Sequence, residues 1–166
     1  MTIKRHRIFL LLSFPFILKL IIACASPSQP MQGERWVIFT AEQAHEQGIS
    51  DWFIQNGQTA EYWTPTEENI LALEDGLGSY LQQANSDRLD GQKAPIWERL
   101  DEYNRQYIGL TLDGIRIIYA NYFCDGVETD WKNDFVFVLD GGDCYFQFKY
   151  DPDSAEFFDL QVNGSA

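Results

Sequence analysis

The sequence predicts an α+β domain in which N-terminal helices pack on a four- to five-stranded antiparallel sheet. Apolar residues recur at three- and four-residue spacing between positions 70 and 81, as they do on one face of a helix. From residue 107 onward, short apolar runs alternate with turns rich in Asp and Gly, which is typical of strands. Because a helical half precedes a strand-rich half, the pattern favours α+β over α/β.

The clearest helix is expected over residues 64–84. Thr64 occupies the N-cap position, Pro65 the first helical position and Glu67 the third, which together form a capping box. The apolar residues after this box share one helical face: Ile70, Leu73, Leu77, Tyr80 and Leu81. This face predicts a helix that packs on the sheet.

Two glycines interrupt this helix, and two shorter helices flank it. Gly76 and Gly78 each weaken the helix by up to about 1 kcal/mol relative to Ala, and we expect them to allow close packing against the sheet. Residues 41–48 are expected to form a helical turn, and Pro95 to start a shorter helix.

Strands are expected at residues 35–40 and, after residue 106, in two hairpins and a last strand. Asp113-Gly114 is a strong signal for a tight hairpin turn, and the run from Asp140 to Asp143 predicts a second turn. The hairpin strands cover residues 107–112 and 115–124, then 135–139 and 144–150, and the last strand covers 157–162.

Alternation places the side chains of the last two strands on defined faces. Phe146 and Phe148 share one face, and Phe158, Leu160 and Val162 share a face of the last strand. A helix across one face of such a sheet resembles cystatin-like or nuclear-transport-factor-like small domains. This resemblance concerns the fold and implies no function.

The first 23 residues have the parts of an export signal. Lys4, Arg5 and Arg7 form a basic segment, and the apolar residues 8–23 come next, interrupted by Lys19. This run is shorter than the ~20 apolar residues that a membrane-spanning helix needs. We therefore expect cleavage, although an uncleaved anchor is an alternative.

The end of this segment resembles the lipobox of bacterial lipoprotein precursors. The pattern is an aliphatic residue, a tolerant position, a small residue and a cysteine, here Ile21, Ile22, Ala23 and Cys24. The resemblance implies that the Cys24 thiol receives a diacylglyceryl group, that cleavage occurs before Cys24, and that the new amino terminus is acylated, for example with palmitate. Two or three acyl chains would hold the protein firmly on a lipid bilayer.

The predicted organisation is a signal at residues 1–23, a flexible tether at 24–33 and a single domain at 34–166. The tether is rich in Ser, Pro and Gln. Ala25, in place of Asp, favours the outer membrane or the cell surface as the destination. Secretion without lipid, after an ordinary signal peptide, is the other alternative.

Removal of the signal makes a strongly acidic chain more acidic. The whole chain has 12 Lys and Arg against 25 Asp and Glu. The signal contains four of the cations and none of the acids, so the mature chain would have a formal charge of −17. This charge argues against nucleic acid as a partner. Because cleavage also removes His6, His45 is the single histidine left, which excludes any site that needs two.

Cys124 and Cys144 form an even pair in an exported chain, which predicts a disulfide. A simple meander through residues 135–139 would place the two cysteines some 15–20 Å apart, by ~3.3 Å per residue, whereas a disulfide needs Cα atoms within ~7 Å. Either residues 125–133 carry the chain back across the sheet, or the cysteines are unpaired.

Other candidate sites are weak. Four acids around Gly126 could provide oxygen ligands for calcium, although their spacing differs from that of an EF-hand: Asp125, Glu128, Asp130 and Asp134. Trp131 lies in the same acidic loop and is the best tryptophan for an exposed ligand contact, whereas Trp63 and Trp97 are expected in the core. We expect no cofactor, since the chain contains no phosphate loop, nucleophile elbow or zinc pattern.

These observations favour a cell-envelope lipoprotein with a non-catalytic binding or assembly domain. Its partners would be the lipid bilayer, through acylated Cys24, and an envelope protein or peptide. One alternative is an envelope hydrolase that uses paired carboxylates. The other is an inhibitor of a basic secreted enzyme, which the acidic charge would suit.

Overall fold

The computed structural model of the chain describes residues 31–49, 60–84 and 94–164. The predicted signal, Cys24 and most of the tether lie outside the described residues. No helix in the described part of the chain is both long enough and apolar enough to cross a membrane.

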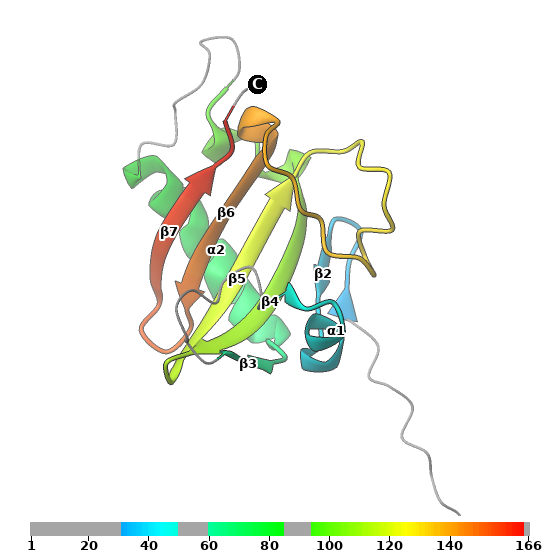
Figure 1. Cartoon of the computed structure of the whole chain (residues 1–166). Helices are drawn as coiled ribbons and strands as arrows, with labels where there is room; N and C mark the ends of the chain where they lie inside the picture. Colours follow the sequence, from blue (N-terminus) through cyan, green and yellow to red (C-terminus); the bar gives the residue numbers. More distant parts are fainter. Residues whose placement is uncertain (1–30, 50–59, 85–93, 165–166) are drawn as a thin grey trace, which may run out of the picture.

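A seven-stranded sheet forms the centre of the domain (Figure 1). The strands are β1 (Met31–Gln32), β2 (Trp36–Ile38), β3 (Ala60–Trp63), β4 (Asn104–Leu112), β5 (Ile115–Phe123), β6 (Tyr145–Asp151) and β7 (Glu156–Val162). They follow the order β1-β2-β4-β5-β6-β7, and β3 pairs with the second half of β4. β2 runs parallel to β4, and the other neighbours are antiparallel.

The α+β class and the packing of helices on a sheet are therefore confirmed, but the strand count and the all-antiparallel pairing were wrong. The sequence did not predict β1 and β3, which are two and four residues long. Strands this short have too few residues to show an alternation of their own. Pairing with β2 and β4 holds them in extended form.

Helix α2 (Glu67–Gln83) crosses one face of the sheet, called the inner face here (Figure 1). Its buried side chains are those of the predicted apolar face: Ile70, Leu73, Leu77 and Leu81. They pack against a layer of aromatic residues from β4, β5 and β6, namely Tyr107, Tyr122, Phe146, Phe148 and Tyr150. Burial of a large apolar side chain contributes roughly 1.5–3 kcal/mol, so this layer is a main source of stability.

The start of α2 differs from the prediction by two residues. The N-cap is Thr66, whose Oγ1 accepts a hydrogen bond from the Asn69 amide at 3.3 Å, while the Asn69 side chain accepts one from the Thr66 amide. Thr64 instead accepts a hydrogen bond from the backbone amide of Ala41 at 2.9 Å. Either Thr64 or Thr66 could cap the helix. Because Thr64 binds the backbone of Ala41, Thr66 is the N-cap.

The shorter helices among the described residues are α1 (Ala41–Glu46) and three single 3-10 turns, η2 (Ile96–Glu98), η3 (Leu100–Glu102) and η4 (Gly142–Cys144). α1 confirms the predicted helical turn, and Thr40 and Gln43 cap it reciprocally. The continuous helix expected from Pro95 was wrong.

The second predicted hairpin was also wrong, because β5 pairs directly with β6. Residues 135–139 form no strand of the sheet. In the β5–β6 ladder, Phe123 lies opposite Tyr145. Cys124 and Cys144, the next residues outward, therefore lie at disulfide distance, with 5.0 Å between their Cα atoms. This geometry is compatible with the predicted disulfide, which would contribute about 3 kcal/mol in the chain-entropy model.

The residues between the cysteines fold back over the outer face of the sheet, opposite α2 (Figure 1). Together with α1 they cover a second apolar cluster, which includes Phe39, Ile108, Leu110 and Ile117, with Phe135 packed against it. This cover lies over β4 and part of β5. Among the described residues, this cover does not extend over the outer face of β6 and β7.

The two helix glycines give a matched pair of stability predictions. A Cβ at Gly76 would lie 2.8 Å from the ring of Phe157, which stacks on Tyr80 at 5.0 Å, whereas a Cβ at Gly78 would meet no atom within 4 Å. Urea unfolding should show that Gly78→Ala raises the free energy of unfolding by about 0.5–1 kcal/mol and that Gly76→Ala lowers it. Equal stabilisation by both changes would contradict the close approach of α2 to β7.

Candidate functional site

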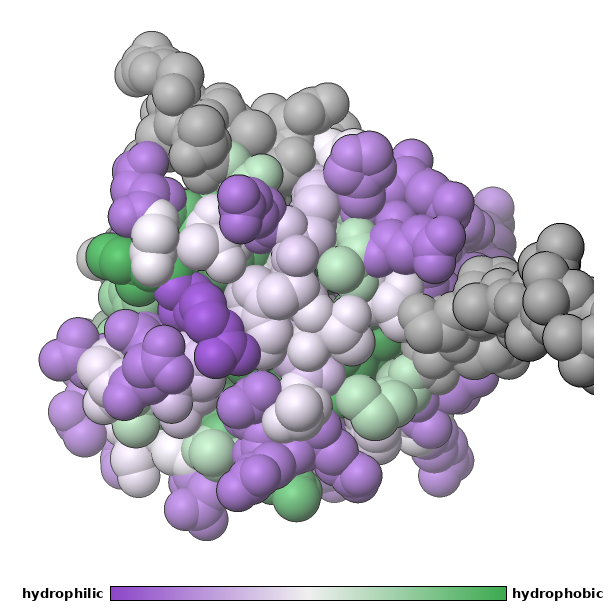
Figure 2. Space-filling view, turned by 90° about the horizontal axis from the view of Figure 1, so that it is seen from below, coloured by the Kyte–Doolittle hydropathy of each residue, from purple (hydrophilic) through white to green (hydrophobic). Residues whose placement is uncertain are grey.

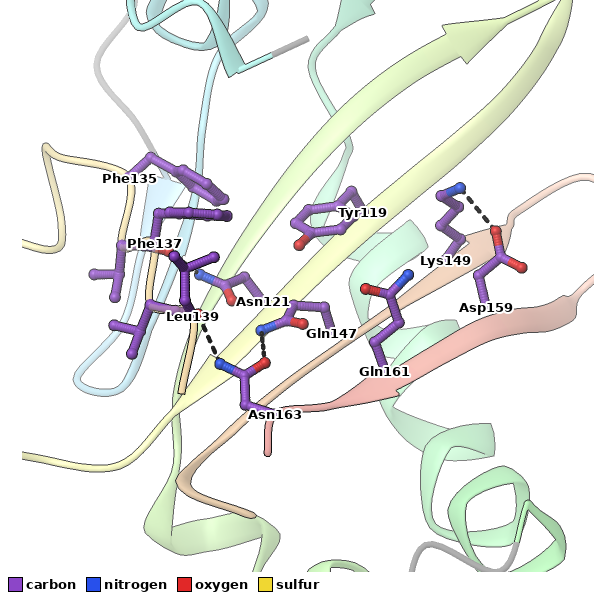
Figure 3. Close-up of a pocket in the computed structure, with 12 residues that line it drawn as sticks. Tyr119, Asn121, Phe135, Phe137, Leu139, Gln147, Lys149, Asp159, Gln161 and Asn163 are labelled. Carbon is purple, nitrogen blue, oxygen red and sulfur yellow. Dashed lines mark hydrogen bonds and ion pairs between the residues drawn. The ribbon is translucent and has the colours of Figure 1, made fainter. Parts of the chain in front are cut away.

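A cavity of about 420 Å³ lies on the outer face, between residues 135–139 and strands β5–β7 (Figure 3). We call it the outer groove. Its lining residues are Tyr119, Asn121, Phe135, Val136, Phe137, Val138, Leu139, Gln147, Lys149, Asp159, Gln161 and Asn163. The volume falls within the roughly 300–1,000 Å³ typical of small-ligand pockets.

The floor of the outer groove consists mainly of uncharged amide side chains. Successive residues of a strand point to opposite faces, so Gln147 and Gln161 point outward while their neighbours in the sequence point toward α2. The ladder places Gln147 directly opposite Gln161. Asn121 and Asn163 extend the same row of amides on β5 and just beyond β7 (Figure 3).

A β-bulge in β7 brings a charged residue into the groove. The β6–β7 register shifts between Gln147 and Lys149, and Asp159 has a φ of 53°. An extra residue in one strand changes the face to which the later side chains of that strand point. Phe157 and Leu160 therefore both pack toward α2, whereas Asp159 lines the groove.

The predicted face of β7, with Phe158 beside Leu160 and Val162, was therefore wrong for Phe158. Leu160 and Val162 pack against the inner core. Phe158 is exposed, and its ring lies 6.0 Å from the Lys149 ammonium on the outer side. Simple alternation failed because the sequence shows no signal for a bulge.

The charges within the outer groove neutralise each other. The ammonium Nζ of Lys149 lies 2.8 Å from Oδ2 of Asp159 and donates a hydrogen bond to it. These are the two charged side chains among the residues that line the cavity. The groove is therefore polar but carries no net charge, although the chain as a whole is strongly acidic.

Residues 135–139 form one apolar wall. Phe137 is 46% exposed and Leu139 is 82% exposed. Tyr119 lies beside this wall, with its ring centroid 6.3 Å from that of Phe135. Burial raises the pKa of Tyr119 well above its usual value.

Buried amides hold this wall on the sheet. The Gln106 side chain is fully buried, donates to the carbonyls of Trp131 and Asp134 at 2.6 and 2.8 Å, and accepts from the Val136 amide at 3.0 Å. Asn121 donates to Gln106 Oε1 and to the Val136 carbonyl at 2.8 Å. Because a buried polar group needs a partner, these two residues determine where the segment lies.

The two ends of the segment are held in the same way. Gln47 donates to the carbonyl of Asn133 and accepts from the amide of Phe135, at 2.6 and 2.7 Å. Asn163 donates to the carbonyl of Val138 at 2.6 Å and to that of Asp140 at 3.1 Å. The wall of the groove is thus fixed from α1, β4, β5 and the end of β7.

A second polar cluster lies under α2. Tyr107 and Tyr122 both donate hydrogen bonds to the carboxylate of Glu74, and Arg105 lies 3.7 Å from the same oxygen. Burial, followed by the charge of Glu74 for Tyr107, raises the pKa of both tyrosines well above the usual value. Because Glu74 lies on the helix and its two hydrogen-bond partners lie on the sheet, we assign this cluster to holding α2 on the sheet.

The described residues that were singled out in the sequence are not among those that line the outer groove. Asp125 is engaged by Arg35 at 3.1 Å and by Asn104 at 2.9 Å, and these hydrogen bonds lower its pKa. Asp130 accepts a hydrogen bond from Asn133. In the described ranges, no three His, Cys, Asp or Glu side chains come together to hold a metal ion, so the four calcium candidates do not converge.

The tryptophans that were singled out in the sequence pack against other side chains of the domain. Trp131 is half-buried against Phe123, with ring centroids 5.7 Å apart, and its carbonyl accepts from Gln106. Trp63 and Trp97 pack against the inner core as predicted. The groove residues were not among the candidates from the sequence. The one signal that could have indicated them is the placing of Gln147 and Gln161 at outward positions of their strands.

Comparisons of the chain with protein-family models, with curated proteins and with solved structures find no match.

The hydrogen bonds from Gln106 to the segment that forms the wall give a prediction on stability. Gln106→Leu would leave the Val136 amide and two carbonyls without their partner, at about 1–3 kcal/mol for each buried group. We expect urea unfolding to show a loss of at least about 2 kcal/mol, and proteases to cut residues 125–141 faster.

Gln147→Leu is the matched control, because the one side-chain hydrogen bond of Gln147 to a described residue is long, 3.4 Å, to Asn163. It should change the free energy of unfolding by less than about 0.5 kcal/mol. Equal losses for both variants would show that Gln106 does not hold the segment.

Proposed function

We propose that this chain is a lipid-anchored cell-envelope lipoprotein whose domain binds a ligand in the outer groove without catalysis. The anchor rests on the lipobox-like residues that end at Cys24. The binding role rests on one observation: a ligand-sized cavity whose amide floor and apolar wall are fixed by buried side chains. Preformed pockets of mixed apolar and polar lining are typical of ligand sites.

The groove supports binding better than hydrolysis. A hydrolase that uses paired carboxylates needs two of them flanking the bond that breaks. Among the residues that line the cavity, Asp159 is the one carboxylate, and it is paired with Lys149. The envelope hydrolase considered from the sequence has no matching pair in this groove.

At the level of the fold, we also propose the cystatin-like roll. It is supported by α2, which crosses one face of a sheet whose four main strands, β4 to β7, form an antiparallel meander. The added strands β1 to β3 extend the sheet at its other edge.

Lipidation is tested by metabolic labelling with palmitate in a bacterial host. The chain should carry the label and sediment with membranes, whereas Cys24→Ser should lose the label. The double variant Cys124→Ser, Cys144→Ser is the control and should keep the label. Absence of label from the unchanged chain would refute the anchor.

The binding role is tested by cosedimentation of the purified full chain with detergent-extracted envelopes of the producing cell. Gln161→Trp places an indole in the groove and should weaken retention at least about tenfold, which corresponds to 1.4 kcal/mol. Leu71→Trp is the control, because Leu71 is 64% exposed on α2, at the other side of the sheet. Retention that is absent, or that is equal in both variants, would refute binding in the groove.

A further inference from the structure

We infer that the outer groove binds a neutral saccharide. This inference rests on the proposed binding role and names the class of ligand. Three features of the groove carry it: a row of amides that can both donate and accept hydrogen bonds, an exposed apolar wall beside them, and charges that neutralise each other within the site.

The amide row matches the hydroxyl groups of a sugar. Each hydroxyl both donates and accepts, and an amide side chain offers two donors and an acceptor. Gln161 is exposed and lies opposite Gln147 on the groove floor, and Figure 3 shows both side chains at the groove surface. The hydrogen bond from Gln147 to Asn163 is long, 3.4 Å, so a ligand hydroxyl can replace it at low cost.

The apolar wall matches the C–H face of a sugar ring. Phe137 and Leu139 remain exposed beside the amides, and Tyr119 adds an aromatic ring with a protonated hydroxyl. An aromatic side chain with a polar end is suited to a ligand that is apolar on one face and polar at its edge. Figure 3 shows the wall on one side of the groove and the amides on the floor and opposite side.

The charge of the site favours a neutral ligand. Lys149 and Asp159 pair with each other at 2.8 Å, so the groove presents no unpaired charge to a ligand. The acidic chain repels anions over a longer range. A cationic ligand would be attracted to exposed carboxylates over the whole acidic surface, and no feature of the groove would make it bind there in preference.

The position of the groove argues against a peptide as its ligand. Peptides that add to a sheet do so at an edge strand, where free backbone groups pair with them. The outer groove lies on the face of β5, β6 and β7. The backbone groups of β5 and β6 pair with strands on both sides, and the open edge of β7 is directed along the sheet and not toward this face. Side chains, and not a sheet edge, therefore make the contact surface.

The test titrates the purified full chain with neutral oligosaccharides of glucose and of N-acetylglucosamine, with uronic-acid oligosaccharides of the same length, and with an uncharged peptide. Calorimetry should detect saturable binding of at least one neutral sugar. Its affinity should change by less than about twofold between low and high salt, because no net charge is involved.

Two groove variants and one control locate the binding. Gln161→Ala removes hydrogen bonds to the ligand and Phe137→Ala removes the stacking surface. Each should weaken binding at least about threefold, within the range for a lost uncharged contact. Leu71→Ala, on the opposite side of the molecule, should leave the affinity unchanged.

The outcomes separate this inference from the proposed function. Suppose that envelope retention depends on Gln161, and that the peptide or the uronic acids bind while no neutral sugar does. This result would overturn the saccharide as the ligand and leave the proposed binding role intact. Neutral-sugar binding that Gln161→Ala and Phe137→Ala do not weaken would overturn the groove as its site. Loss of both envelope retention and sugar binding would overturn the two proposals together.

Discussion

Direct pairing of β5 with β6 is the constraint on which the rest of the structure depends. It places Phe123 opposite Tyr145, so the chain between them must leave and return at the same end of the two strands. The inner face of the sheet is already occupied by α2. Residues 125–141 therefore lie on the outer face, over β4 and part of β5, and they end beside strands that they do not cover. The outer groove is the boundary between the covered and uncovered halves of that face (Figure 3).

Amide side chains have two roles on this outer face, and burial separates them. Gln106 and Asn121 are buried and bind the backbone of the returning segment. Gln147 and Gln161 stand on the neighbouring strands beyond the segment, where solvent and ligands reach them. A buried amide stabilises the wall because leaving its partners unsatisfied would be costly. An accessible amide loses little when it exchanges water for a ligand hydroxyl. Seen from below, the described surface is strongly hydrophilic mainly toward its edges and near-neutral at its centre, with small apolar patches (Figure 2).

The inner face supplies the rigid support for this arrangement. Aromatic rings of β4, β5 and β6 pack under α2, and the hydroxyls of Tyr107 and Tyr122 are satisfied by Glu74 from the helix itself. Gly76 lets α2 approach the ring of Phe157 on β7. Packing against α2 on the inner face thus fixes the strands that form the groove floor, and this keeps their outward side chains in place for binding.

The sequence by itself determined the elements that depend on neighbours along the chain. The helical spacing from Ile70 to Leu81 predicts α2, and Asp113-Gly114, both with positive φ, predicts the β4–β5 turn. The lipobox-like residues before Cys24 are also a local pattern. Only the tertiary structure decided the short strands, the bulge at Asp159, the return of residues 125–141 and the outer groove that results from them. Each of these depends on a hydrogen bond or a packing contact between different segments of the chain, and no pattern within one segment encodes such a contact.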